Sequence, residues 1–252
     1  MAEQERPGRP IGMAIRYLCH DRPDLRTFDT EVVDTRPGAV VLAQSALYPG
    51  GGGQLPDRGL IRWAGGKVRV ERLEGQADKL WHLFAEPVEV RGQVQGVVDG
   101  AFRQLMCQLH TDLHILNALV YQEFEGALVT GVQMAADGTA RIDFDLPMRD
   151  NNTFCALEPT INDAIRQDLA VRQVYVAAAE AAREPGLIRS QAVAPPPQPD
   201  GSIRVVEIIG LDRQACGGTH LGSTGQSAPV RVLKVDNKGR HNRRIRIGLI
   251  GV

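Results

Sequence analysis

Short hydrophobic runs alternate with turns rich in Gly, Pro and Asp from Gly12 to about Val98. The clearest run is residues 67–73, where apolar and charged side chains alternate with the period of two that is typical of a half-buried strand. Comparable runs occupy residues 13–18, 39–42 and 59–63. Because about six such runs follow one another at short spacing, the pattern predicts a small β-barrel or β-sandwich.

The period of the pattern changes at Asp99. Between Asp99 and about Phe124, apolar residues recur at helical spacing, and no proline interrupts the run. The apolar stripe of this predicted helix consists of Leu105, Leu109, Leu113, Leu116 and Val120. This is the strongest helical pattern in the chain, and it ends the β-rich N-terminal region.

Helical and strand-like periods alternate after the long helix. A strand is predicted over residues 139–145, and a second helix from about Glu158, where apolar residues stand four positions apart. Further strands are predicted at residues 171–176, 203–209, 230–235 and 244–247, with a short helical run at 177–183. The fold class is therefore α+β: a β-barrel-like domain over residues 1–98, then an α+β domain over residues 99–252 whose long helix packs on an antiparallel sheet.

Composition places the chain among ordinary soluble globular proteins. Of its 252 residues, 43% are hydrophobic and 23% charged, and only 5% are aromatic, so aliphatic side chains must fill the core. Acidic and basic residues nearly cancel, 30 against 29, which at first argues against a strongly anionic partner. No secretory signal or membrane-spanning run is apparent. The four cysteines lack C-x-x-C spacing, which favours a cytoplasmic protein over a disulfide framework.

Two histidines, His110 and His114, stand four residues apart within the long predicted helix. Residues at this spacing project from one helix face about 6 Å apart, the separation that two imidazoles need to bind one Zn²⁺ ion. The pair alone is weak evidence, because such pairs also occur by coincidence on surfaces and in cores. Thr111 stands where zinc proteases of the H-E-x-x-H type carry their general base, which argues against that class.

A second pair, Cys216 and His220, lies in the segment Cys-Gly-Gly-Thr-His after a predicted strand. A thiolate and an imidazole at this spacing can chelate one ion, although alone they are more simply explained as a buried cysteine and an incidental histidine. Together, the two pairs predict a zinc site assembled from segments about a hundred residues apart. Four protein ligands would close a tetrahedral site and three would leave a position for water or substrate; the sequence leaves both open.

Four consecutive glycines, residues 50–53, precede Gln54 in a glycine-rich segment. Without Cβ atoms this loop can adopt positive φ angles and bring its N–H groups close to an anion or a sugar–phosphate backbone. Many such loops are only tight turns. The spacing matches neither the P-loop nor the G-x-G-x-x-G fingerprint, which argues against nucleoside triphosphates and dinucleotides as ligands.

Basic charge is concentrated in the C-terminal segment 231–246. It holds seven Lys or Arg residues and one acidic residue, Asp236, so the rest of the chain is acidic. A solvated hairpin would have a similar composition, but clustering on two strands and their loop is the footprint expected for phosphate contacts. The near-neutral total charge therefore conceals a localised basic region.

Four motifs in this order closely resemble the AlaX family, free-standing relatives of the editing domain of alanyl-tRNA synthetase. They are the glycine segment 50–59, His-Thr-Asp-Leu-His at 110–114, Cys-Gly-Gly-Thr-His at 216–220 and the basic segment 238–244. The resemblance runs from about residue 12 to the C-terminus and is to the longer, two-domain form of the family. It implies a zinc-containing hydrolase that deacylates tRNA(Ala) mischarged with serine, and also with glycine. The implied ligands of one Zn²⁺ per chain are His110, His114, Cys216 and His220.

The resemblance also implies which residues meet the substrate. Thr130 is the best match to the family residue that contacts the serine hydroxyl, with Gln133 second, although Val132 stands where the family has a glycine. We expect zinc to anchor the aminoacyl end near its α-amino group while a positioned water attacks the ester, with Asp112 or a ribose hydroxyl as the base. Further substrate contacts are expected from Gly51, Gly52, Gly53, Gln54, Arg243 and Arg244.

Two other functions are compatible with the same motifs. Related editing domains act on seryl-tRNA for threonine, which makes deacylation of Ser-tRNA(Thr) a second enzymatic hypothesis. A zinc-stabilised module with four closed ligands would bind tRNA through its basic strands without catalysis. Neither the oligomeric state nor the way in which tRNA identity is read follows from the sequence.

Overall fold

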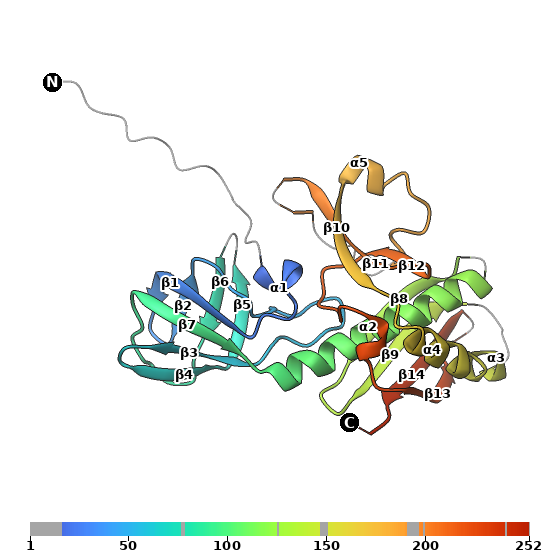
Figure 1. Cartoon of the computed structure of the whole chain (residues 1–252), viewed down its shortest axis with the longest axis horizontal. Helices are drawn as coiled ribbons and strands as arrows, with labels where there is room; N and C mark the ends of the chain where they lie inside the picture. The colour runs from blue at the N-terminus through green and yellow to red at the C-terminus, as the bar shows by residue number, and fades with distance from the viewer. Residues whose placement is uncertain are drawn as a thin grey trace.

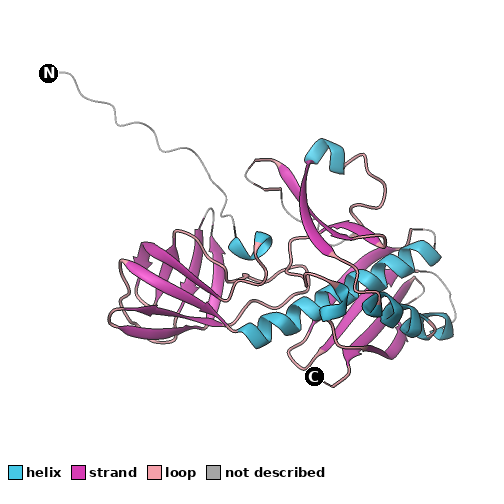
Figure 2. Cartoon of the chain, in the orientation of Figure 1, coloured by secondary structure: helices cyan, strands magenta, loops and turns pink. Residues whose placement is uncertain are grey.

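The computed structural model describes residues 17–76, 79–124, 126–146, 151–190, 197–198, 200–239 and 241–251. Within these ranges the chain is a mixed α+β protein with three antiparallel sheets (Figures 1 and 2). The class predicted from the sequence is therefore confirmed.

Seven strands form one curled antiparallel sheet in the N-terminal part of the chain (Figure 1). Their order in the sheet is β4-β3-β7-β1-β2-β6-β5. The strands are β1 (Thr27–Arg36), β2 (Ala39–Leu42), β3 (Gly59–Trp63), β4 (Gly66–Val70), β5 (Arg72–Gln76), β6 (Lys79–Leu83) and β7 (Gln93–Val98). Aliphatic side chains on the inner face of the curl, such as Val40, Ile61 and Leu80, form its core.

Two strand predictions in this part need correction. The alternating run 67–73 is not one strand, because the chain turns at Glu71 and the run is divided between β4 and β5. Of the predicted strand 13–18, residues 13–16 lie outside the described part, and Leu18 begins the short helix α1 (Leu18–Asp21). Hydrophobic alternation identified the apolar residues here but not the turn that separates them.

The long helix α2 (Gly100–Glu123) connects the two parts of the chain (Figure 1). It begins at Asp99, whose side chain caps it by accepting a hydrogen bond from the Phe102 N–H at 3.1 Å. The predicted span of this helix is confirmed to within a residue at each end. Although α2 is long, no helix among the described residues is apolar enough over a sufficient length to cross a membrane.

Helix α2 packs on a four-stranded antiparallel sheet of order β13-β14-β9-β8. These strands are β8 (Leu128–Met134), β9 (Thr139–Asp145), β13 (Val230–Asn237) and β14 (Asn242–Leu249). A three-stranded sheet contains β10 (Val171–Ala177), β11 (Ser202–Ile208) and β12 (Asp212–Ala215), and the remaining helices are α3 (Asn151–Cys155), α4 (Leu157–Arg166), α5 (Ala178–Ala181) and η1 (Thr224–Gln226). The strands and the second helix predicted after residue 124 are confirmed.

Separate hydrophobic clusters lie on the two sides of Asp99. The first fills the curled sheet, and the second surrounds α2 and includes Leu109, Leu116, Phe144 and Ile245. These are the two largest of the hydrophobic clusters among the described residues, and separate cores are the usual physical basis of separate domains. We propose that these clusters are the cores of two domains, 1–98 and 99–252.

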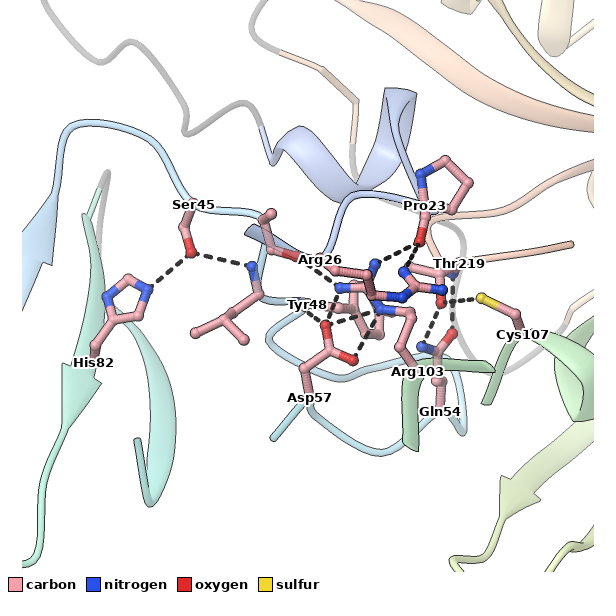
Figure 3. Close-up of polar contacts among 12 residues, drawn as sticks. Pro23, Arg26, Ser45, Tyr48, Gln54, Asp57, His82, Arg103, Cys107 and Thr219 are labelled. Atoms are coloured by element: carbon pink, nitrogen blue, oxygen red, sulfur yellow. Dashed lines mark hydrogen bonds and ion pairs between the residues drawn. The ribbon is translucent and has the colours of Figure 1, made fainter. Parts of the chain in front are cut away.

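A buried ion pair fastens the glycine-rich segment of the N-terminal part to α2 (Figure 3). The Nε of Arg103 donates to both carboxylate oxygens of Asp57, at 3.0 and 3.1 Å, and both side chains are 0% exposed. The other guanidinium nitrogens donate to the carbonyl oxygens of Pro23 and Ala46, at 2.9 and 2.6 Å. Asp57 also accepts the Tyr48 N–H at 2.6 Å. Both charges are therefore paired inside the protein, and the ion pair fixes the position of the glycine-rich segment relative to α2.

Replacing Arg103 with Met should lower the free energy of unfolding by about 3–5 kcal/mol, because it leaves the Asp57 carboxylate buried without its partner. Adding Asp57→Asn should recover part of this loss by removing the buried charge. Urea denaturation followed by circular dichroism at neutral pH measures both effects. A loss below about 1 kcal/mol for the single variant would mean that the pair contributes no more than a surface ion pair.

Candidate metal centre

Four side chains that can bind a metal converge at one point. His110 and His114 come from α2, and Cys216 and His220 from the loop that follows β12. Their donor atoms all lie within 4.8 Å of one another. Cys216 Sγ is 3.4 Å from His110 Nε2 and 3.3 Å from His220 Nε2. The fold thus brings together, from two distant segments, the four residues that the sequence identifies as ligands.

Burial sets the protonation of these donors. Loss of water lowers the pKa of His110 and His220 well below the usual value and that of His114 to about 3, so the imidazoles are neutral at pH 7. Burial also raises the pKa of the Cys216 thiol. Three neutral imidazoles and a sulfur form the N/S donor set that suits Zn²⁺ or a similar borderline-soft cation. The residues therefore fit a metal ion in both chemistry and mutual distance.

Hydrogen bonds from outside the cluster orient two of the three imidazoles. The Nδ1 of His110 lies 2.8 Å from the Oε1 of Gln54, and the Nδ1 of His220 lies 3.5 Å from the Thr111 hydroxyl. The Nδ1 of His114 is 3.9 Å from a carboxylate oxygen of Asp212, which is too far for a hydrogen bond. Hydrogen bonds of the kind made by His110 and His220 fix the tautomer and the ring direction of a ligating histidine.

The glycines of Cys-Gly-Gly-Thr-His have a steric function. A Cβ on Gly218 would lie 2.1 Å from His110 Cε1 and 2.8 Å from Gln54 Oε1. Any other residue at this position would therefore push the His110 ring out of place. The glycine allows the loop to approach α2 closely enough for Cys216 and His220 to reach the cluster.

A cavity of about 540 Å³ lies against the cluster. His110, His114 and Cys216 line it, whereas His220 is not among the lining residues, so three of the four candidate ligands face the space. Glycines 50–53 form another wall, and the apolar wall consists of Leu113, Val129, Val132 and Ile142. The volume is typical of small-molecule sites, and the metal donors lie at its surface.

The glycine loop is a tight turn at the edge of this cavity. Gly51 and Gln54 exchange backbone hydrogen bonds of 3.1 and 3.0 Å, and Gly52 and Gly53 between them have φ angles of 57° and 83°. Gly51 and Gly52 are exposed at its tip. A Cβ on Gly53 would lie 2.6 Å from the Val132 carbonyl oxygen, so a glycine is needed where the loop meets β8. Gly51, Gly52 and Gly53 thus line the cavity, and their contact with a substrate stays a prediction.

Thr130 and Gln133 do not line the cavity. Strand β8 has an irregular register between Val129 and Gly131, and the Thr130 hydroxyl donates to Asn242 Oδ1 at 3.0 Å. Gln133 is exposed on the same strand. Val129 and Gly131, the neighbours of Thr130, do line the cavity. The predicted contact of Thr130 with a serine hydroxyl therefore requires this side chain to leave Asn242.

Asp112 lies in the protein interior and not at the cavity. It is 0% exposed, and its carboxylate accepts the Ser227 hydroxyl at 2.9 Å. Burial raises its pKa well above the usual value. Because Asp112 is two residues from each of the helical histidines, it projects from a different face of α2. Its position does not support the predicted role as general base.

Gln54, Arg243 and Arg244 lie in places that the sequence did not predict. Gln54 is 3% exposed and lies behind His110 instead of at the cavity surface. Arg243 is 4% exposed, and Arg244 donates to both oxygens of Asp143, at 2.7 and 2.8 Å. The exposed cations of the described basic segment are instead Arg231, Lys234, Lys238 and Arg246; Arg240 lies outside the described residues.

Sequence reasoning missed Asn117 and Arg204. Asn117 lines the cavity three residues after His114, and its buried Oδ1 has no hydrogen-bond partner among the described residues. Its helical spacing from His114 was a usable signal. Arg204 is 1% exposed and donates to the Cys216 carbonyl oxygen at 2.7 Å, which ties β11 to the metal loop. A single arginine within an apolar strand does not indicate in the sequence that it contacts the site.

Comparison with known proteins shows what the chain is similar to. The family profile described as "Threonyl and Alanyl tRNA synthetase second additional domain" matches residues 203–246. Fold and site thus define an α+β protein with a candidate metal centre, part of which is similar to a domain of threonyl- and alanyl-tRNA synthetases.

Individual relatives of the chain point to one family within this class of proteins. The alanyl-tRNA editing protein AlaX-M of Saccharolobus solfataricus is 32% identical over 225 residues, covering 88% of this chain and 93% of the relative. The protein of the same name from Methanosarcina mazei is 31% identical over 237 residues, covering 90% and 93%. The alanine–tRNA ligase of Thermofilum pendens is 34% identical over 228 residues, covering 86% of this chain but 24% of the ligase. The chain belongs to the AlaX family of alanyl-tRNA editing proteins.

Replacing Gly218 with Ala should reduce bound metal from about one ion per chain to nearly none, because the added methyl group would occupy the place of the His110 ring. Elemental analysis of the purified protein measures the metal content. Gly222→Ala is a matched control, since a Cβ there meets only the flexible Gln226 side chain, at 3.6 Å. Full metal content in the Gly218 variant would contradict the proposed ligand geometry.

Proposed function

We propose that this protein hydrolyses the ester bond of mischarged tRNA(Ala), mainly Ser-tRNA(Ala) and also Gly-tRNA(Ala). Membership of the alanyl-tRNA editing family supports tRNA(Ala) as the partner. The observation that carries the proposal is the cavity, because three of the four candidate metal ligands and the glycine loop face the same space. A binding module that used the metal only to hold its fold would have no need for an accessible cavity at the metal ligands.

The donor set supports Zn²⁺ as the metal, with His110, His114, Cys216 and His220 as the residues that would hold it. When bound, Zn²⁺ supplies a positive charge that attracts the aminoacyl end of the substrate and polarises groups next to it. The remaining tasks fall to the protein. The apolar wall, including Leu113 and Ile142, excludes bulk water from the ester.

The glycine loop is suited to the terminal nucleotide. A Cβ on Gly52 would meet nothing within 4 Å, so the tip of the loop is open space that a ribose or a phosphate can approach. The exposed cations Arg231, Lys238 and Arg246 on the C-terminal hairpin are suited to the phosphates of the acceptor stem. Their charge gives an otherwise acidic molecule a surface for tRNA.

Selectivity for serine requires a polar group that meets its hydroxyl. A pocket for a small apolar side chain rejects an added hydroxyl only about 10²-fold, whereas a site that hydrogen-bonds the hydroxyl discriminates more strongly. Thr130 is the family-based candidate, but it must first leave Asn242. Asn117 is a second candidate, because the residue lines the cavity and its buried Oδ1 has no hydrogen-bond partner among the described residues.

Ser-tRNA(Thr) is the second candidate substrate, because the matching family profile is named for both threonyl- and alanyl-tRNA synthetases. The chemistry at the cavity would be the same. Only the tRNA body would differ, so the two proposals are separated by exchanging the tRNA.

Deacylation of a panel of aminoacyl-tRNAs tests the proposal. Ser-tRNA(Ala) should be hydrolysed faster than Gly-tRNA(Ala), and both much faster than Ala-tRNA(Ala) or Ser-tRNA(Thr). Replacing both Cys216 and His220 with Ala should abolish activity and lower bound zinc, since it removes two of the four donors. Faster hydrolysis of Ser-tRNA(Thr) would favour the second candidate. Binding of tRNA with no hydrolysis of any ester would favour a non-catalytic module.

Two variants identify the residue that meets the serine hydroxyl. Asn117→Ala should slow hydrolysis of Ser-tRNA(Ala) about tenfold relative to Gly-tRNA(Ala), which is the effect of losing one hydrogen bond that glycine cannot make. Because both rates come from one protein preparation, a general loss of folding cancels in their ratio. Thr130→Val should change the ratio less. A larger change of this ratio in Thr130→Val than in Asn117→Ala would assign the hydroxyl contact to Thr130.

A further inference from the structure

Gln54 connects the glycine loop to both halves of the metal centre. Figure 3 shows one of these connections, the contact between Gln54 and Thr219. Its Oε1 lies 2.8 Å from His110 Nδ1 and accepts the backbone N–H of Thr219 at 3.0 Å. Its Nε2 donates to the Thr219 hydroxyl at 2.8 Å. His110 belongs to the ligand pair on α2, and Thr219 lies between Cys216 and His220. One buried amide therefore contacts both segments that supply the metal ligands.

These contacts determine the orientation of the amide and the tautomer of His110. A backbone N–H can only donate, so the atom of Gln54 that faces Thr219 N must be the oxygen. The same oxygen faces His110 Nδ1, so this nitrogen must carry a proton for the two to attract each other. In a neutral imidazole the other nitrogen then holds a free lone pair. That nitrogen, Nε2, is the one that lies 3.4 Å from Cys216 Sγ.

We propose that Gln54 is a positioning residue of the metal centre, which holds His110 in the Nδ1-protonated tautomer with Nε2 directed at the metal. The sequence predicted Gln54 as a substrate contact, but the residue is buried and lies outside the cavity lining. It acts on the metal through His110 and on the loop through Thr219.

The glycine loop is rigid enough for this role. Gly51 and Gln54 exchange backbone hydrogen bonds, and the Gly53 carbonyl oxygen accepts the Met134 N–H of β8 at 2.8 Å. The loop is thus closed by its own hydrogen bonds and braced against β8. Because Gln54 belongs to this loop, the position of the loop determines where the Gln54 amide meets His110.

The other two imidazoles show what Gln54 contributes. His220 Nδ1 has a longer contact, 3.5 Å, and His114 Nδ1 has no hydrogen-bond partner among the described residues. Without Gln54, His110 would lose its defined tautomer as well, and its ring would be restrained only by packing. A loss of this kind typically lowers metal affinity by about 10- to 100-fold.

Metal affinity of the full-length chain tests this proposal. Zn²⁺ dissociation constants would be measured by competition with a chromophoric chelator for the wild type, Gln54→Leu and Gln54→Glu. The Leu variant should bind Zn²⁺ about 10- to 100-fold more weakly. The Glu variant should remain within a few-fold of the wild type, because a carboxylate oxygen accepts the same two N–H groups. Gln76→Leu, on the exposed end of β5, is the matched control and should not change affinity.

Spectra separate positioning from a general loss of structure. In the Co²⁺-substituted Leu variant, the ligand-field bands should shift and broaden relative to the wild type, while far-UV circular dichroism of the metal-free protein stays unchanged. Rescue of the spectrum by Gln54→Glu would show that an acceptor at this position is what matters. Equal affinity and equal spectra in the wild type and a folded Leu variant would overturn the proposal.

One measurement needs no variant, so the proposal remains testable if Gln54→Leu does not fold. Long-range ¹H–¹⁵N correlation of the Zn²⁺-loaded wild type should show His110 with a proton on Nδ1 and the metal on Nε2. A proton on Nε2 would overturn it. These measurements do not depend on the proposed function. If Gln54→Leu weakens Zn²⁺ binding but the wild type hydrolyses no ester, only the editing activity is contradicted. If the wild type hydrolyses the ester but Gln54→Leu binds Zn²⁺ as tightly as the wild type, only the role of Gln54 is contradicted.

Discussion

Burial of three imidazoles and a thiol around one point is the constraint on which the rest of the structure depends. Neutral nitrogen donors held within 4.8 Å of one another and shielded from water satisfy one another poorly unless they share a cation. Their arrangement also dictates local sequence. His110 and His114 must be four residues apart on one helix, and Gly218 must lack a side chain for the loop to approach them. A metal bound here stabilises the fold and faces the cavity at the same time.

The N-terminal part of the chain is attached to the helix of this centre by two side-chain contacts. One face of α2 carries Arg103, which pairs with Asp57, and two turns later His110, which contacts Gln54. Both partners lie in the glycine-rich segment, so the curled sheet holds its loop against the helix at two points. The glycine loop thereby forms a wall of the cavity while its last residue supports a ligand. Contact of a substrate with the loop would therefore be mechanically linked to the position of His110.

Much of this could be predicted from the sequence, because periodicity and ligand spacing are local properties. The helix 100–123 and the strand 139–145 follow directly from the positions of apolar residues, and the two chelating pairs follow from their spacing. The burial of Arg243 was also readable, since it shares a strand face with Ile245 and Ile247, but its charge suggested a surface role. The direction in which the Thr130 side chain points could not be predicted, because an irregularity in β8 breaks the alternation of side chains there. The contacts of Gln54 and Arg204 could not be predicted either, because they depend on how distant segments pack.

The most direct test of this account is the dependence of deacylation on bound metal in a single preparation of the wild type. Metal-free protein, made with a chelator, would be titrated with Zn²⁺ while the rate of Ser-tRNA(Ala) hydrolysis and the bound metal are recorded together. The account predicts a rate close to the uncatalysed one without metal, which rises in proportion to bound Zn²⁺ and reaches its plateau at about one ion per chain. Full activity in folded protein that contains no metal would contradict it.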